Sequence, residues 1–140
     1  MQPWRRIFCP VDFSEHSRMA LEQAAYLARA VGCELTVMHV HEREVVEPLP
    51  TDRDVAAEEA GITERLQVLV CEVGLSTSKV DIEVVLGVPA TEILRCAEDG
   101  GFDAIVMGTH GRTGLTHLLL GSTAERVVRH APCPVVIVRR

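Results

Sequence analysis

The sequence predicts a doubly wound α/β domain, in which a five-stranded parallel sheet carries helices on both of its faces. Two observations support this prediction. Short apolar runs alternate with helical patterns along all 140 residues. The runs are apolar at consecutive positions, as strands covered on both faces require. A hydrophobic content of 47% suits one substantial core, so we expect a single domain over residues 1–140.

The first half of the chain contains two strand patterns and two helical patterns. Residues 6–13 are predicted as a strand that ends at positions 10–12, because proline is poorly tolerated inside a central strand. Ser14 is the expected N-cap of a helix whose apolar residues recur every three or four positions until Gly32. A second strand (34–40), a charged loop (41–50) and a weaker helical period (54–73) follow.

The second half repeats this alternation. A third strand (80–86) is broken at residues 87–89, and a short helix then reaches Gly100 and Gly101. A fourth strand (104–107), a helix (122–130) and a fifth strand (135–138) complete the pattern. If the strand order is 3-2-1-4-5, the ends of the first and fourth strands are neighbours at the point where the order reverses. Ligands of open parallel sheets bind at that point, beyond the carboxyl ends of the strands.

Composition excludes several classes of function. The formal net charge of −6 and the absence of a basic run argue against nucleic-acid binding. No apolar run approaches the roughly 18 residues of a membrane span, and the start of the chain does not read as a signal peptide. The five cysteines are odd in number and form no CxxC pair, which indicates neither a disulfide framework nor a zinc knuckle. We expect a cytoplasmic protein.

The stretch GTHGRTGLTHLLLGSTAERV, residues 108–127, is the candidate ligand loop. Glycines admit a ligand close to backbone N–H groups, and the helix starting at Ser122 offers free N–H groups with a positive dipole end. The amides of Gly121, Ser122 and Thr123 are therefore expected to accept an anion, with Arg112 as the nearest fixed positive charge. Alternatively, Ser122 and Glu125 form a capping box that satisfies the helix start. The two interpretations can hold together.

Two common phosphate motifs do not fit. A Walker loop needs a lysine directly after its last glycine, whereas Gly121 is followed by serine and the one lysine of the chain is Lys79. The dinucleotide fingerprint GxGxxG belongs after the first strand, and GTHGRTG has neither that spacing nor that place. Phosphate binding here uses a different loop.

The spacing Gly108-x2-Gly111-x9-Gly121-Ser122 resembles the ATP-binding signature of the universal stress protein family. RIFCPVDFSEHSRMAL, VMHV and GVPATEIL are similar to other parts of that family, so the resemblance covers nearly the whole chain. It implies an adenine nucleotide alpha hydrolase-like fold with ATP, or another adenine nucleotide, across the switch point. It also implies a nucleotide-binding set of Pro10, Val11, Asp12, Val40, Gly108, Gly111, Arg112, Gly121, Ser122 and Thr123.

The resemblance divides these residues by role. Pro10, Val11 and Asp12 contact adenine and ribose, and the Val40 backbone hydrogen-bonds adenine. Gly108 and Gly111 admit the ribose and phosphates, while residues 121–123 hold the phosphate tail. The family often has a further basic residue where this chain has Thr116 and His117. Bound Mg²⁺ or Mn²⁺ is therefore expected to offset the repulsion between the phosphates and an acidic protein.

The fifth strand is apolar and lies at the edge of the expected sheet, where it invites pairing with another chain. The family commonly dimerises through this strand, so a homodimer is expected through Val135, Val136, Ile137 and Val138. A monomer whose own loop covers the edge is the alternative.

Other residue groups have weaker functional interpretations. His39 and His41 share one side of a strand, but two histidines are weak evidence for metal, and we expect surface or partly buried histidines. His110, Asp12 and Ser122 lack the elbow of a hydrolytic triad. Cys133, between two prolines, is expected to be inert.

The sequence thus favours an ATP-binding regulatory module of the stress response over an enzyme, because no lysine is placed to reach the γ-phosphate. The alternatives are a weak metal-dependent ATPase or phosphotransferase, and a nucleotide-free dimeric interaction protein. ATP, ADP and cyclic AMP all remain candidate ligands.

Overall fold

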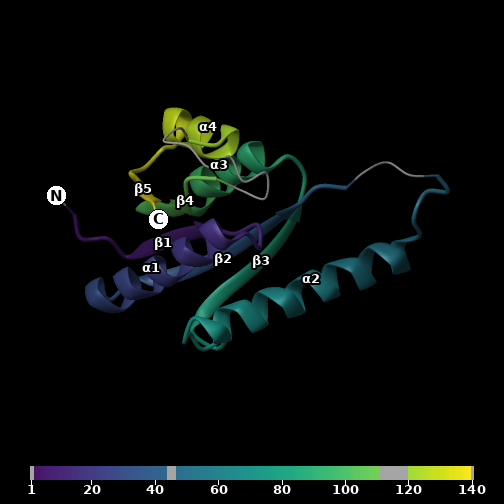
Figure 1. The fold of residues 1–140 in the computed structure, drawn as a ribbon, viewed down its shortest axis with the longest axis horizontal. Coiled ribbons are helices and arrows are strands. Elements are labelled where there is room, and N and C mark those ends of the chain that lie inside the picture. The colour runs from purple at the N-terminus through teal and green to yellow at the C-terminus, as the bar shows by residue number, and fades with distance from the viewer. Residues whose placement is uncertain (1, 44–46, 111–119, 140) are drawn as a thin grey trace.

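The computed structural model describes residues 2–43, 47–110 and 120–139, and contains parallel strands in the order β3-β2-β1-β4-β5 (Figure 1). The predicted fold class and strand order are confirmed. The strands are β1 (Arg6–Pro10), β2 (Glu34–His41), β3 (Val80–Leu86), β4 (Ala104–Gly108) and β5 (Val135–Val138). The helices are α1 (Glu15–Val31), α2 (Asp52–Glu72), α3 (Pro89–Gly100) and α4 (Ser122–His130).

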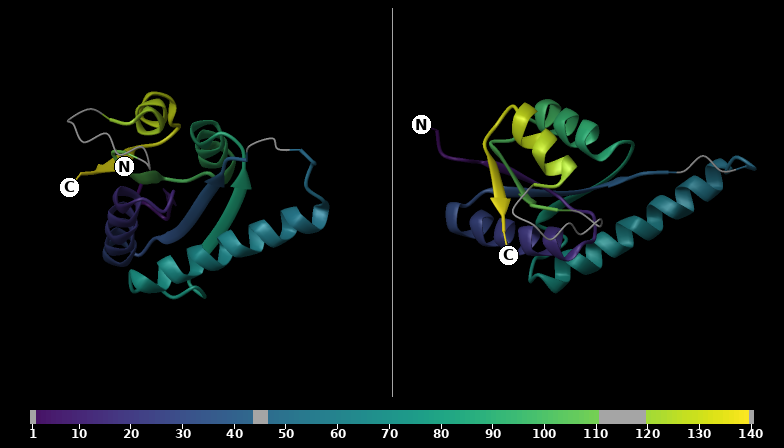
Figure 2. Two further views of the ribbon diagram at one scale, coloured as in Figure 1. Left: turned by 45° about the vertical axis from the view of Figure 1, so that its right-hand side comes forward. Right: turned by 45° about the horizontal axis from the view of Figure 1, so that its top comes forward.

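Each face of the sheet has its own apolar core. Helices α1 and α2 cover one face, and α3 and α4 cover the other (Figures 1 and 2). Side chains of β1 alternate between the two cores: Ile7 and Cys9 pack towards α1 and α2, whereas Phe8 packs towards α3 and α4. Strands covered on both faces are apolar at most positions, which explains the nearly continuous apolar runs of the sequence.

The ends of α1 are those expected from the sequence. The Ser14 hydroxyl accepts the N–H of Ser17 at 3.2 Å, and Gly32 adopts a left-handed φ of 78° while its N–H donates to the Ala28 carbonyl. Both caps are confirmed. They fix the length of α1 and therefore the position of its first turn beside the end of β1.

Helix α2 begins two residues earlier than predicted, because Thr51 and Asp54 form a capping box. The Thr51 hydroxyl accepts the N–H of Asp54 at 3.2 Å, and the Asp54 carboxylate accepts the N–H of Thr51 at 2.9 Å. These hydrogen bonds from Thr51 hold the pKa of Asp54 below its usual value. The apolar period identified the helix but not its charged first turn.

The first half of α2 extends beyond the sheet (Figures 1 and 2), and its buried residues begin at Ile62. Glu58 connects this half to the end of β2, because its carboxylate pairs with Arg43 and lies 2.7 Å from Nε2 of His41. The hydrogen bond from Arg43, and after it that from His41, lowers the pKa of Glu58. None of the described helices is long and apolar enough to cross a membrane.

Candidate functional site

The carboxyl ends of β1 and β4 are neighbours, as the predicted strand order requires. Strand β1 pairs with β2 as far as Pro10, but its pairing with β4 stops at Phe8 and Ile105. Successive residues of a strand inside a parallel sheet direct their N–H and carbonyl groups to opposite neighbouring strands. The Arg6 carbonyl accepts a hydrogen bond from the chain just before β4. The backbone groups of Pro10, four residues later, therefore face β4 as well. Proline has no N–H to donate there. The hydrogen-bonded pairing of β1 with β4 therefore ends before residues 10–12, which are predicted to meet a ligand.

Asp12 follows the buried residue Val11 and turns the chain into α1. Val11 is held by β2, since its N–H donates to the Met38 carbonyl and its carbonyl lies 2.8 Å from Nδ1 of His39. The Asp12 carboxylate accepts the N–H of Ser14 at 2.9 Å, and the Asp12 N–H donates to the Ser17 hydroxyl at 3.2 Å. These bonds fix Asp12 at the tip of β1.

Phe13, which the sequence analysis did not single out, has a left-handed φ of 64°. This conformation is rare for a bulky residue and marks a local strain. The ring of Phe13 contacts two partners: the Arg65 guanidinium is 4.0 Å from its centroid, and the His39 ring centroid is 4.7 Å away, with the two rings tilted. A groove of about 530 Å³ between the start of α1 and α2 adjoins Phe13 and Arg65. These two contacts hold the turn that positions Asp12.

Val40 lies near the end of β2 and is buried, with 8% of its surface exposed. Its side chain belongs to the core under α3 and α4. The Met38 carbonyl accepts a hydrogen bond from the chain that follows β1, whereas the His41 carbonyl accepts one from Gly87, which follows β3. Because alternate residues of a strand face the same neighbour, the backbone groups of Val40 face β1, as those of Met38 do. The Val40 amide and carbonyl therefore point towards the β1 side beyond Pro10.

Gly108 ends β4 at a point where it packs closely against α1. A Cβ at this position would lie 2.7 Å from the His16 carbonyl oxygen, so the missing side chain makes room for the backbone of α1. Thr109 and His110 follow, each only 9% exposed. The Thr109 hydroxyl lies 3.0 Å from Nδ1 of His110 and 3.5 Å from Nδ1 of His16. Sequence reasoning missed His16 and Thr109, since nothing local indicates that α1 meets β4 here.

The predicted capping box at Ser122 is wrong. Gly121 is the N-cap of α4, with extended φ and ψ of −62° and 161°, and its carbonyl accepts the N–H of Glu125. The N–H of Gly121 is also engaged, since it donates to the Thr109 carbonyl at 2.7 Å. Glycine has no capping side chain, so the first-turn amides of Ser122 and Thr123 are not capped by the N-cap residue. These two amides, rather than three, are the candidates for an anion.

Gly111 and Arg112 lie outside the described residues, as do Thr116 and His117. Within the described part of the predicted set, residues 10–12 form the end of β1 and the turn after it, and Val40 lies on the neighbouring strand β2. Gly108 ends β4, the other neighbour of β1, and Gly121 donates its N–H to Thr109, the residue after Gly108.

The other residue groups are accounted for by local contacts. His39 is buried rather than partly buried, and its ring centroid lies 6.2 Å from that of His41, which pairs with Glu58. Among the described residues, no three His, Cys, Asp or Glu side chains are grouped to hold a metal ion. Burial raises the pKa of Cys133, in agreement with an inert thiol.

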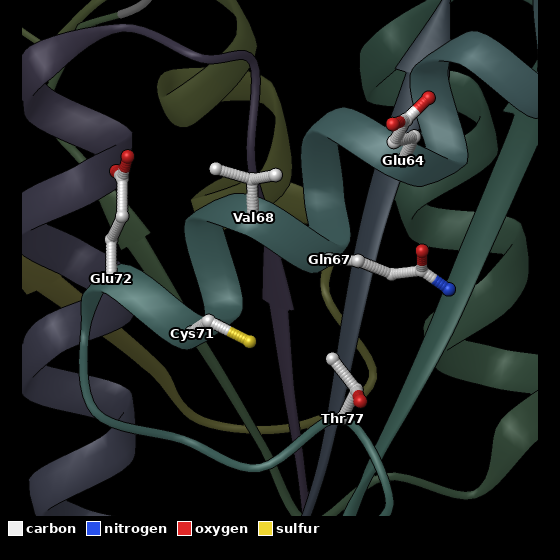
Figure 3. Close-up of a pocket in the computed structure, with 6 residues that line it drawn as sticks. All are labelled: Glu64, Gln67, Val68, Cys71, Glu72 and Thr77. Carbon is white, nitrogen blue, oxygen red and sulfur yellow. The ribbon is translucent and has the colours of Figure 1, made fainter.

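A groove of about 600 Å³ on the outer side of α2 lies away from this site (Figure 3). It is lined by Glu64, Gln67, Val68, Cys71, Glu72 and Thr77. Thr77 lies in the loop that leads into β3, so the groove is near the amino end of that strand. Its two carboxylates disfavour an anion, and we assign it no part in nucleotide binding.

The whole-chain pattern decides the family. Residues 3–139 match the family model described as the universal stress protein family. The chain belongs to the universal stress protein family. One relative, a universal stress protein of Methanocaldococcus jannaschii, is 34% identical over 98% of this chain and 83% of its own. A second from the same organism is 31% identical, over 98% of this chain and 96% of its own.

Solved structures agree with this assignment. The structure reported for the hypothetical protein MJ0577 superposes with a TM-score of 0.75 at 29% identity, covering 99% of this chain and 98% of that chain. A universal stress protein solved in complex with cAMP has a TM-score of 0.74 at 20% identity, over 99% of both chains. One from Archaeoglobus fulgidus in complex with dAMP has a TM-score of 0.66 at 23% identity, over 99% and 100%. The last two share the fold of this chain.

Proposed function

We propose that this chain binds an adenine nucleotide, ATP in the first place, at the switch point between β1 and β4. One observation carries the proposal: the pairing of β1 with β4 stops at Phe8 and Ile105, the Val40 backbone faces β1 beyond Pro10, and the first turn of α4 is joined to the chain just after β4 by the hydrogen bond from Gly121 to Thr109. Two structures of the same fold are complexes with adenine nucleotides. Family membership and local chemistry therefore support the same ligand.

The residues divide between the two ends of the nucleotide. Val40 offers a backbone donor and acceptor for adenine, and the Asp12 carboxylate accepts a ribose hydroxyl. Ser122 and Thr123 donate their amides and hydroxyls to phosphate oxygens, and the dipole of α4 favours negative charge there. The loop with Gly111 and Arg112 completes the phosphate site. Mg²⁺ or Mn²⁺ bound to the phosphates lowers the charge that an acidic protein has to accept.

We propose a regulatory role rather than fast catalysis. Lys79, the one lysine of the sequence, precedes β3 and lies far along the chain from the α4 start. Rapid phosphoryl transfer commonly uses a lysine at the phosphates and a residue that orients the attacking water, and the sequence offers no obvious candidate for either. Nucleotide occupancy instead shifts a conformational or assembly equilibrium of a cytoplasmic stress-response protein, formed by one domain over residues 1–140.

The experiment combines two measurements on the purified protein. Mass spectrometry after gentle purification identifies any retained nucleotide. ATP with Mg²⁺ is expected to raise the melting temperature, because a ligand at a hundredfold excess over Kd stabilises by about 2.7 kcal/mol. Guanosine nucleotides are the control. No retained nucleotide, together with no shift by ATP, ADP or cyclic AMP, excludes the proposal and favours an interaction protein. Steady metal-dependent ADP release indicates the weak ATPase instead.

We also propose that β5 forms a homodimer with a second copy. The Pro134 carbonyl accepts the N–H of Ile105, so the even-numbered residues of β5 direct their backbone groups to β4. Val135 and Ile137 consequently direct their N–H and carbonyl groups to the open edge. These groups are available for an antiparallel partner strand, provided that no other part of the chain covers them.

Ile137→Pro is expected to convert the dimer to a monomer in size-exclusion chromatography with light scattering. Proline removes an outward N–H and leaves the hydrogen bonds to β4 in place. The matched control is Val84→Pro, on the strand at the opposite edge of the sheet. The odd-numbered residues of β3 direct their backbone groups to β2, so those of Val84 face away from the sheet. A dimer that persists in Ile137→Pro, or a wild-type monomer, contradicts this interface.

A further inference from the structure

We propose that Arg65 is a positioning residue that sets how strongly the nucleotide site prefers ribose over deoxyribose. Its guanidinium holds Phe13 in a left-handed conformation, and Phe13 in turn directs the Asp12 carboxylate to the ribose. This inference rests on the proposed function. It adds helix α2 to the site, although α2 supplies none of the residues of the nucleotide signature.

Phe13 lies between the two residues whose hydrogen bond closes the turn after β1. The Asp12 carboxylate accepts the N–H of Ser14 at 2.9 Å, and the φ angle of the intervening Phe13 is 64°. Rotation of Phe13 to a negative φ would turn the Ser14 N–H away from that carboxylate. A left-handed conformation is rare for a bulky residue and persists only where surrounding contacts impose it. The position of the Asp12 carboxylate therefore depends on the contacts that hold Phe13.

Two side chains from other elements contact the Phe13 ring. The His39 ring centroid, from β2, is 4.7 Å from its centroid, and the Arg65 guanidinium, from α2, is 4.0 Å away. His39 is buried and is also hydrogen-bonded to the Val11 carbonyl, so its replacement would disturb the core as well as the turn. Arg65 is exposed, so its contact with the ring can be removed without opening a cavity. The contribution of Arg65 can therefore be tested separately.

A carboxylate that is fixed before binding discriminates better than a mobile one. A carboxylate accepts several hydrogen bonds, so Asp12 can accept a ribose hydroxyl together with the N–H of Ser14. A deoxynucleotide that lacks this hydroxyl cannot form the bond. When the turn is held in advance, binding does not have to order Asp12, and the bond contributes fully to the preference for ribose. When Phe13 is released, part of that contribution is lost to ordering the turn.

The positive charge of Arg65 does not by itself produce such a preference. A cation attracts ADP and deoxy-ADP equally, because the two carry the same phosphates. Arg18 lines the same groove as Arg65, but it pairs with Glu22 and Glu72. Arg18→Gln therefore removes an equal charge from the groove and leaves the contact between Arg65 and Phe13 in place. It is the matched control.

The experiment is calorimetry of ADP, 2′-deoxy-ADP and 3′-deoxy-ADP with Mg²⁺. Wild type is expected to prefer ADP about tenfold over the analogue that lacks the hydroxyl bound by Asp12, as a hydrogen bond to a charged group allows. Arg65→Gln is expected to reduce this preference by about threefold, the size of an exposed cation–π contact. Phe13→Leu, which lacks an aromatic face, has the same effect. Arg65→Lys restores part of the preference, and Arg18→Gln leaves it unchanged.

A double variant tests whether Arg65 acts through Asp12. Asp12→Asn is expected to lose most of the preference for ribose, and Arg65→Gln then lowers it little further, because coupled residues are not additive. Melting temperatures without nucleotide show that each variant is folded. A substitution that only affects stability changes these temperatures and not the ratio of the two affinities.

Three results overturn the inference and leave nucleotide binding intact. They are an equal preference for ribose in wild type and Arg65→Gln, no such preference in a wild type that binds ADP, and an equal loss in Arg18→Gln and Arg65→Gln. A wild-type protein that does not bind ADP overturns the proposed function as well.

Discussion

Gly108→Ala is expected to lower the free energy of unfolding by about 3 kcal/mol, the upper part of the range for an overpacked interior. The new Cβ would lie 2.7 Å from the carbonyl oxygen and 2.8 Å from the carbonyl carbon of His16. These atoms belong to the backbone of α1, so no rotation of a side chain relieves the contact. Either α1 moves away from β4 or the end of β4 shifts, and both movements disturb buried packing.

Gly61→Ala is the matched control for this substitution. Gly61 lies inside α2, and a Cβ there meets nothing within 4 Å. Alanine favours a helix over glycine by about 1 kcal/mol, so this variant is expected to be slightly more stable than wild type. Chemical denaturation of the three proteins measures both effects. A Gly108→Ala variant as stable as wild type shows that α1 and β4 are not packed as closely as the structure has them.

The fold was predictable because its main cause is local. A parallel strand covered on both faces is apolar at consecutive positions, and a helix on the sheet repeats its apolar residues every three or four positions. Both signals survive in a single sequence. The order β3-β2-β1-β4-β5 depends on contacts between segments far apart in the sequence, so it followed from the family resemblance rather than from the local patterns.

The sequence predicted a candidate site at the ends of the first and fourth strands, but not the tertiary contacts that the structure shows there. Proline and glycine often mark the ends of helices and strands, and here Pro10 ends β1 and Gly121 precedes α4. The role of Gly108 depends on a helix that is 92 positions away in the sequence at His16. The left-handed Phe13 is held by Arg65, which belongs to α2. Such contacts arise from tertiary packing, and no pattern within one segment records them.

The N-terminus of α4 shows how a local rule is overridden. The letters Ser-x-x-Glu predict a capping box, but Gly121 donates its N–H to Thr109 at 2.7 Å and adopts the extended N-cap conformation itself. This tertiary bond moves the helix start so that Ser122 is its first residue. Consequently the Ser122 hydroxyl is not needed as the cap, and remains a candidate ligand for phosphate.

Gly121→Val is expected to weaken the binding of ATP with Mg²⁺ by about a hundredfold or more. A hydrogen bond from an amide to a charged group contributes about 1.5–3 kcal/mol, and two amides, those of Ser122 and Thr123, depend on the placement of this residue. A Cβ on Gly121 already lies 3.2 Å from the Thr109 carbonyl oxygen and 3.3 Å from the His110 Cα. The two further methyl groups of valine have to push these backbone atoms away.

Valine does not conflict with the backbone of Gly121, whose φ and ψ of −62° and 161° suit any residue. The expected loss therefore comes from crowding between α4 and the chain after β4. Gly121→Ala is predicted to lie between wild type and valine, since its one methyl group requires a shift of only a few tenths of an ångström. Gly61→Val, at an open position on α2, controls for added bulk. Calorimetric affinities and melting temperatures are measured for all four proteins. A folded Gly121→Val variant that binds ATP as tightly as wild type shows that the phosphates do not lie on the first turn of α4.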